Sequence, residues 1–157
     1  RKDELPSYNK VFLSEVEFEL ERISPEISGA VEKAYANHLQ QLLSEGQLAA
    51  SSTLMRTAIL NIFRMKRESG NLPSVRVGCA INAAIWWDKS RKFKKNDFHD
   101  VGHAQAAIPY CDYFFTEKNI KNIVTAGHVG LAEAYNCETI SNPGDALSAL
   151  KGLTQNQ

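Results

Sequence analysis

The first half of the chain carries hydrophobic residues at helical spacing. Over residues 10–23 the pattern begins strand-like, because Val11 and Leu13 stand at alternate positions, and it becomes helical after a predicted N-cap at Ser14. Apolar residues then recur at spacings of three and four between helix breakers, which is typical of amphipathic helices. The pattern predicts further helices over about 26–45, 47–68 and 72–87, with boundaries at Ser24, Pro25, Gly46 and Gly70.

The second half alternates helices with short strands. Asn96 is the predicted N-cap of a helix over about 97–108, which Pro109 ends. Short strands are predicted at 113–116 and 138–140, and helices over about 117–124, 131–135 and 143–150. This order predicts an α/β fold that is helix-rich, with a small parallel sheet flanked by helices. We expect a single domain over 1–157, in which 26–88 forms a helical, insertion-like region.

The amino-acid composition restricts the classes of partner that we expect for this protein. The 157 residues contain 18 Lys and Arg and 18 Asp and Glu, so the formal net charge is zero and any basic surface must be local. No apolar run approaches the roughly 20 residues of a membrane helix, so no membrane partner is expected. Cys79, Cys111 and Cys137 are widely spaced and show no zinc-binding pattern. They predict reduced thiols in a cytoplasmic protein.

Acidic side chains gather between 97 and 117. Asp97, Asp100 and His103 are spaced so that they share one face of the predicted helix. Asp112 stands at the start of the following strand and Glu117 just past its end. Because groups at the carboxyl ends of parallel strands meet in one crevice, Glu117 is the better placed of the two. Carboxylates are the ligands that Mg²⁺ and Mn²⁺ prefer. The alternative to a metal-binding role is a structural one, in which Asp97 and Asp100 only cap the helix.

The order of these residues resembles the C-terminal motif of PIN-like domains, a family of metal-dependent ribonucleases. The matching residues run from Asp100 through His103, Ala104, Ala106 and Ala107 to the Tyr-Cys-Asp and Phe-Phe-Thr-Glu strings at 110–117. The segments 131–135, 136–141 and 143–150 look like the closing helix, strand and helix of that family. The stretch 12–22 resembles its central segment, whose metal-binding Glu is placed at Glu19, with Glu15, Glu17 and Glu21 as the other registers.

The resemblance implies metal-assisted hydrolysis of RNA phosphodiester bonds, with Mg²⁺ or Mn²⁺ as cofactor. Asp100 and Glu19 would bind the metal, and Asp97 and Glu117 would bind the metal or its water. His103, Asp112 and Thr116 would orient those ligands. PIN-like domains also open with a hydrophobic strand carrying an Asp, and nothing upstream of Ser14 matches it. We expect that strand to lie before Arg1.

A basic loop stands immediately before the acids. Its cations predict contacts to the phosphate backbone of single-stranded RNA, and its aromatic residue predicts base stacking. The predicted RNA-binding residues are Lys89, Arg91, Lys92, Phe93, Lys94 and Lys95. The alternative is an ordinary solvated loop.

Two other functional classes fit the same sequence. The first is a helical binding or regulatory module, or a catalytically inactive PIN relative, with a partner or a second copy docking on the helices of 26–88. Trp86 and Trp87, at the end of an apolar helix, are then interpreted as core or interface. The second is an enzyme of another type, such as a phosphatase, that uses the same acids. The nuclease hypothesis itself fits a toxin or an RNA-processing enzyme, and a toxin would have an antitoxin-type protein partner.

Overall fold

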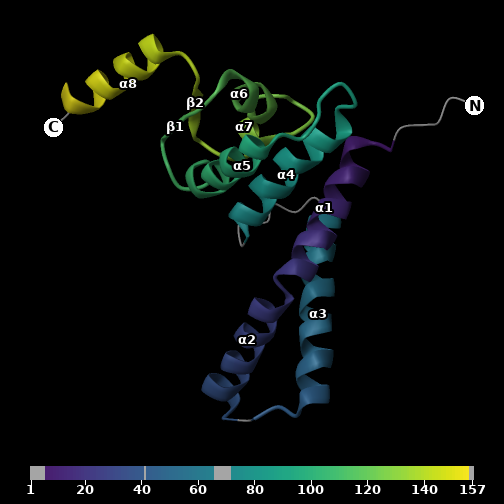
Figure 1. Ribbon diagram of the computed structural model, residues 1–157. Coiled ribbons are helices and arrows are strands. Elements are labelled where there is room, and N and C mark those ends of the chain that lie inside the picture. The colour runs from purple at the N-terminus through teal and green to yellow at the C-terminus, as the bar shows by residue number, and fades with distance from the viewer. Residues whose placement is uncertain (1–5, 41, 66–71, 156–157) are drawn as a thin grey trace, which may run out of the picture. The chain divides into compact units, whose positions relative to one another are not determined.

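The computed structural model describes residues 6–40, 42–65 and 72–155 (Figure 1). The chain forms two compact units. We call Arg1–Phe12 with Asn71–Gln157 the C-terminal unit, and Leu13–Gly70 the helical unit. The expectation of one domain stays a prediction. None of the helices in the described part of the chain combines the length and the apolar character needed to span a bilayer.

The helical unit begins within α1 (Tyr8–Arg22), whose first residues belong to the C-terminal unit. Val16 and Leu20, four residues apart, are buried on the same face of α1. The strand-like start predicted from Val11 and Leu13 is wrong, because both residues lie inside this helix and Ser14 does not begin it. Two alternating positions are too few to outweigh the helical spacing that follows them.

The prediction of one helix over 26–45 is also wrong. α2 (Ser24–Ala34) passes into a π-helical turn, η1 (Tyr35–Leu39), and Gln40 then adopts a left-handed conformation with φ of 51°. α3 (Glu45–Arg64) begins at Ser44, whose hydroxyl accepts from the Gln47 backbone N–H while the Gln47 side chain accepts from the Ser44 N–H. Gly46 therefore lies in the first turn of α3 instead of ending the preceding helix. The predicted end at Gly70 lies outside the described residues.

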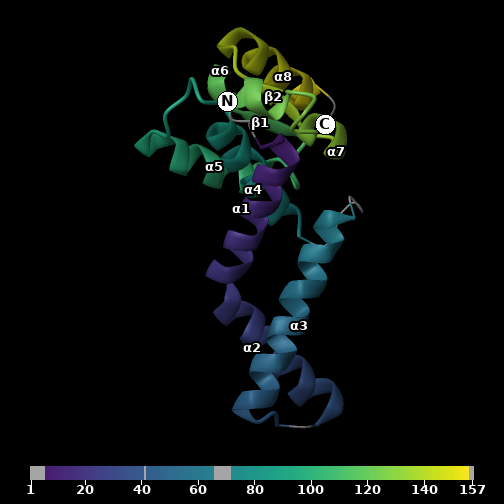
Figure 2. The same ribbon diagram turned by 90° about the vertical axis from the view of Figure 1, so that its right-hand side faces the viewer.

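α2 packs against α3 in the helical unit, as both views of the molecule show (Figure 2). The buried residues of this pair are few and are Ile27, Val31, Ser52 and Phe63. The start of α2 agrees with the sequence, because Pro25 stands in its first turn, where a missing backbone N–H costs nothing.

The C-terminal unit has the element order that the sequence predicted. It consists of α4 (Pro73–Trp87), α5 (Lys95–Ala107), β1 (Tyr113–Phe115), α6 (Lys118–Val124), α7 (Leu131–Ala134), β2 (Glu138–Ile140) and α8 (Pro143–Gln155). β1 and β2 pair in parallel, with Phe114 opposite Thr139. The helix-rich α/β class with a small parallel sheet is therefore confirmed at this coarse level.

The core of this unit is built around α4. Val77, Ile81 and Ile85 are almost completely buried and pack with Ile120 and Leu131, among others. α4 also packs against α5, where the side chain of Gln105 occupies the space beside Gly78. Because α4 is buried on most of its surface, its C-terminal end at Trp87 is held firmly, and the loop that follows begins from a fixed point.

Candidate nucleic-acid interface

Three aromatic rings lie around the basic loop that connects α4 to α5. Trp86 stacks on Phe93 with ring centroids 5.8 Å apart and planes 12° from parallel, and Phe98 meets Phe93 edge-on at 6.3 Å. Trp86 is 60% exposed and Phe98 is 75% exposed, although large aromatic side chains are usually buried. Trp86 is therefore not a core residue, and its alternative interpretation as an interface residue stays a prediction.

Lysines stand beside Phe93 along the chain. Lys92, Lys94 and Lys95 are exposed, and none of them forms an ion pair with another described residue. Their charges are therefore available to an anionic partner. We call this group the aromatic–basic surface, and its members are Trp86, Phe93, Phe98, Lys92, Lys94 and Lys95.

Arg91, which the sequence placed among the RNA-binding cations, has a different environment. Its Nη2 donates to Oδ1 of Asp97 at 2.6 Å, and both side chains are largely buried. The other oxygen of Asp97, Oδ2, accepts from the backbone N–H of Lys94 at 2.7 Å. α5 therefore begins at Lys95, and Asp97 supplies the cap that the sequence had assigned to Asn96.

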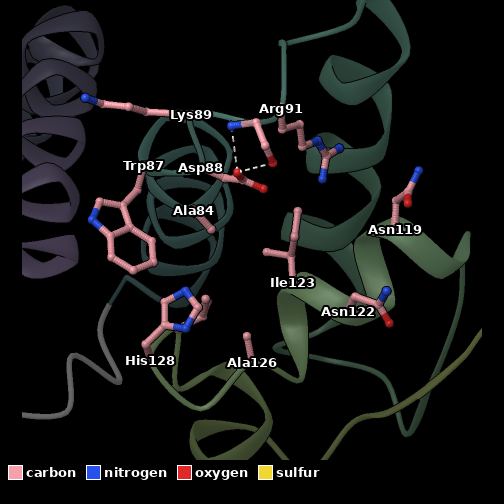
Figure 3. Close-up of a pocket in the computed structure, with 12 residues that line it drawn as sticks. Ala84, Trp87, Asp88, Lys89, Arg91, Asn119, Asn122, Ile123, Ala126 and His128 are labelled. Carbon is pink, nitrogen blue, oxygen red and sulfur yellow. Dashed lines mark hydrogen bonds between the residues drawn. The ribbon is translucent and has the colours of Figure 1, made fainter. Parts of the chain in front are cut away.

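A pocket of about 570 Å³ lies beside this loop, between the end of α4 and helix α6 (Figure 3). Its floor is apolar and includes Ala84 and Ile123. Its rim carries both charged and amide groups, from Asp88 and Arg91 in the loop and from Asn119 and Asn122 on α6. We call it the α4–α6 pocket.

Trp87 and His128 form one wall of the α4–α6 pocket. Their ring centroids are 5.0 Å apart, and Tyr8 contacts His128 edge-on at 5.1 Å and Trp87 edge-on at 6.1 Å. The indole N–H of Trp87 donates to the Pro6 carbonyl at 3.1 Å, and the Tyr8 hydroxyl donates to the Ala80 carbonyl at 3.0 Å. These contacts hold the aromatic wall in one orientation. Burial raises the pKa of the Tyr8 hydroxyl, so it stays protonated and continues to donate.

The acids predicted around α5 and β1 have unequal surroundings. Asp100 on α5 is half-buried and makes no hydrogen bond or ion pair with any described residue. Glu117 is exposed at the N-cap of α6, but its side chain makes no capping hydrogen bond. His103 is exposed on α5. Asp100 and Glu117 therefore keep their carboxylates free of contacts within the described part of the chain.

Asp112 and Thr116 take part in the sheet through their backbones. The Asp112 carbonyl accepts from the Glu138 N–H at 2.8 Å, and the Thr116 N–H donates to the Ile140 carbonyl at 2.9 Å. The side chain of Asp112 is exposed, and Thr116 is half-buried. Neither side chain has an observed contact that orients another acid, so that role stays a prediction.

The acid predicted from the central segment, Glu19, lies on α1 in the helical unit. Its two carboxylate oxygens accept from Arg22, at 2.7 Å from Nε and 2.5 Å from Nη2. Its alternative Glu21 pairs with Arg56 on α3. Glu15 is half-buried, and this burial, with the charge of Glu19, raises the pKa of its carboxyl. The grouping of any of these acids with Asp100 stays a prediction.

The described residues do not by themselves fit a metal centre. Over 6–40, 42–65 and 72–155, no three His, Cys, Asp or Glu side chains come close enough together to hold an ion. Asp97, one of the four predicted ligands, already uses both oxygens in the contacts to Arg91 and Lys94. The Mg²⁺ or Mn²⁺ cofactor therefore stays a prediction.

Comparison with known proteins adds no identification. No protein-family model, curated protein or solved structure matches the chain. The likeness to PIN-like domains therefore depends on the sequence motifs alone.

Sequence reasoning found Lys89 and Arg91 among the residues that line the α4–α6 pocket, as predicted RNA-binding residues, but it missed its other polar residues. Asn119 and Asn122 follow the first strand at a spacing of three, which indicates one helix face, but exposed asparagines on helices are common. His128 has no partner nearby in the sequence, because its contacts come from Tyr8 and Trp87. Phe98 was not singled out, and Trp86 was assigned to the core or an interface because an apolar helix end predicts burial. Only the fold brings these side chains together.

Proposed function

We propose that the protein binds single-stranded RNA in the cytoplasm through the aromatic–basic surface. The observation that carries this proposal is the exposure of Trp86 and Phe98 on either side of Phe93, among lysines that form no ion pair with described residues. Proteins that bind single strands combine these two features, because every base has a face that can stack and every phosphate carries a charge. Duplex RNA offers no unstacked base to such a surface.

The stacking step is tested by removing one exposed ring. Base stacking contributes about 1–3 kcal/mol per base, so Trp86→Ala is expected to weaken binding of a 12-nucleotide RNA by roughly 5- to 150-fold. Fluorescence anisotropy with a labelled strand measures the dissociation constant, and Phe98→Ala is a second variant of the same surface.

The matched control is Phe18→Ala, which removes an aromatic side chain of similar exposure, 69%, from α1. Its affinity for RNA should equal that of the unmodified protein. Unchanged affinity in both Trp86→Ala and Phe98→Ala would contradict the proposal. An equal decrease in all three variants would also contradict it, since the effect would then not belong to this surface.

A second candidate function is cleavage of the bound strand, as the PIN-like resemblance implies. The observation that favours it is the half-buried carboxylate of Asp100, which has no hydrogen-bonding or charged partner among the described residues. A carboxyl group without such a partner keeps its oxygens available to a ligand. Cleavage of single-stranded RNA that needs Mn²⁺, stops with a chelator and is abolished in Asp100→Asn would support this candidate.

A further inference from the structure

The α4–α6 pocket has an aromatic wall and an amide wall. Trp87 and His128 lie on one side, and Asn119 and Asn122 lie on the other, with Ile123 between them (Figure 3). The two asparagines are three residues apart on α6, so their amides project from one side of that helix. Each amide offers a carbonyl oxygen and two N–H donors, and neither is bonded to a described residue.

The charges around this pocket nearly cancel. Asp88 accepts hydrogen bonds from the backbone N–H and the hydroxyl of Ser90, which lower the pKa of its carboxyl and keep it ionised. Arg91 supplies one positive charge but is paired with Asp97. The ammonium group of Lys89 extends away from the pocket (Figure 3). A neutral ligand therefore fits the interior better than a phosphate.

The size and shape of the pocket further restrict the class of ligand that fits it. A volume of about 570 Å³ lies within the range of roughly 300–1,000 Å³ that holds one small organic molecule. An aromatic wall suits a flat ring, and paired donors and acceptors on the facing wall suit a polar ring edge. A neutral, flat ring with donors and acceptors along one edge is the chemical description of a nucleobase.

We propose that the α4–α6 pocket binds one unstacked nucleobase. Its plane lies against Trp87 and His128, and its hydrogen-bonding edge faces Asn119 and Asn122. For a base that belongs to an RNA strand, the proposal rests on the RNA binding proposed above, because the strand must then reach the basic loop. Lys89, directed away from the pocket, is then placed for the phosphate that follows this base.

Nucleosides test the pocket separately from the RNA surface. The ¹⁵N-labelled full chain is titrated with adenosine, cytidine, guanosine and uridine, and with ribose 5-phosphate as a ligand without a base. We expect at least one nucleoside to shift the side-chain amide resonances of Asn119 and Asn122, and ribose 5-phosphate to leave them unchanged.

Variants on α6 measure how much the two asparagine amides contribute to nucleoside affinity. The double variant Asn119→Ala, Asn122→Ala removes the amide wall without touching the core, since both residues are exposed. It should weaken nucleoside binding by about 5- to 150-fold, because one well-placed pair of hydrogen bonds to a base contributes on the order of 1–3 kcal/mol. Asn9→Ala removes an exposed asparagine from α1 and should bind nucleosides as the unmodified protein does.

The outcomes separate the two proposals. If no nucleoside shifts the pocket amides while Trp86→Ala still weakens RNA binding, the pocket proposal is overturned and the RNA proposal stands. If a nucleoside binds in the pocket but the 12-nucleotide strand does not bind, the RNA proposal is overturned and the pocket proposal stands. Equal shifts with ribose 5-phosphate, or unchanged nucleoside affinity in the double variant, also overturn a base-binding pocket.

Discussion

Asp97 and Asp100 stand one turn apart on α5, yet only Asp97 has partners. Asp97 is 5% exposed, and its two oxygens join the guanidinium of Arg91 and the backbone of Lys94. Asp100 is half-buried and has no such contact within the described residues. The same residue type therefore has a structural role at the first position and is available for a ligand at the second.

This difference gives a matched pair of substitutions. Asp97→Asn is expected to lower the free energy of unfolding by about 2–3 kcal/mol, because it leaves the largely buried Arg91 without its counter-ion. Asp100→Asn should leave stability unchanged or raise it slightly, since it removes an unpaired charge. Urea unfolding followed by circular dichroism measures both. Equal destabilisation by the two variants would contradict the assignment of Asp97 as the structural residue.

At the scale of single elements, α1 carries four acids at alternating positions, of which Glu15 is half-buried. Burial, and then the charge of Glu19, raise the pKa of the Glu15 carboxyl above its ordinary 4.5. Between the unfolded and the folded pKa the folded chain binds more protons, so the contribution of Glu15 to stability falls as the pH rises through that interval. At neutral pH the ionised group is therefore slightly destabilising.

Glu15→Gln should accordingly raise the free energy of unfolding at pH 7 and have no such effect at about pH 3.5, below both pKa values. We expect the gain to be less than about 1 kcal/mol, because a half-exposed carboxylate is still solvated. Urea unfolding at the two pH values measures it. Glu17→Gln, at an exposed position on the same helix, is the control and should show no gain. A gain for Glu15→Gln that persists at low pH would contradict this explanation.

The π-helical turn after α2 shows how an element boundary escapes the hydrophobic pattern. Leu39 and Leu42 continue the apolar spacing of α2, and the sequence alone favours one helix through them. In the structure Leu39 ends the π-helical turn and Leu42 lies beyond it, and both side chains are exposed, at 57% and 89%. Apolar residues extend a helix only where another surface buries them.

At the scale of the whole molecule, the charge is balanced but locally uneven. The formal net charge is zero, so the protein has no general attraction for nucleic acid. The proposed RNA binding would therefore depend on the lysines of the aromatic–basic surface, and it should weaken as salt increases. Exposed apolar residues in the helical unit, such as Phe18 and Leu54, fit the predicted protein partner or second copy, which stays a prediction.

The salt dependence of binding reports how many lysines touch phosphates. Replacing Lys92 and Lys94 by Ala should reduce the slope of log affinity against log salt by about 0.7 for each phosphate of a single strand that is no longer neutralised. Anisotropy titrations between low and moderate salt give the slope. The control pair, Lys33→Ala with Lys151→Ala, removes the same charge from α2 and α8 and should keep the original slope. An unchanged slope in the Lys92 and Lys94 variant would place the phosphate-binding cations elsewhere.

Much of the C-terminal unit follows from the sequence alone. Pro73 at the start of α4, the short apolar strand at 113–115 and the strand at 138–140 were predicted within a residue or two, as was their parallel pairing. These features depend on local chemistry: a proline that tolerates the first turn, β-branched and aromatic runs, and connections too long for a hairpin. The positive charge of the loop between α4 and α5 was likewise predicted, since residue type alone identifies its Lys and Arg side chains.

The tertiary structure decided which of the candidate side chains have neighbours and which are exposed. It paired Asp97 with Arg91, left Trp86 and Phe98 in solvent, and placed His128 against Tyr8 and Trp87, which stand 120 and 41 positions earlier in the numbering. Spacing along a chain determines which residues share a helix face. It does not determine which faces meet, because that depends on packing between segments that are distant in sequence.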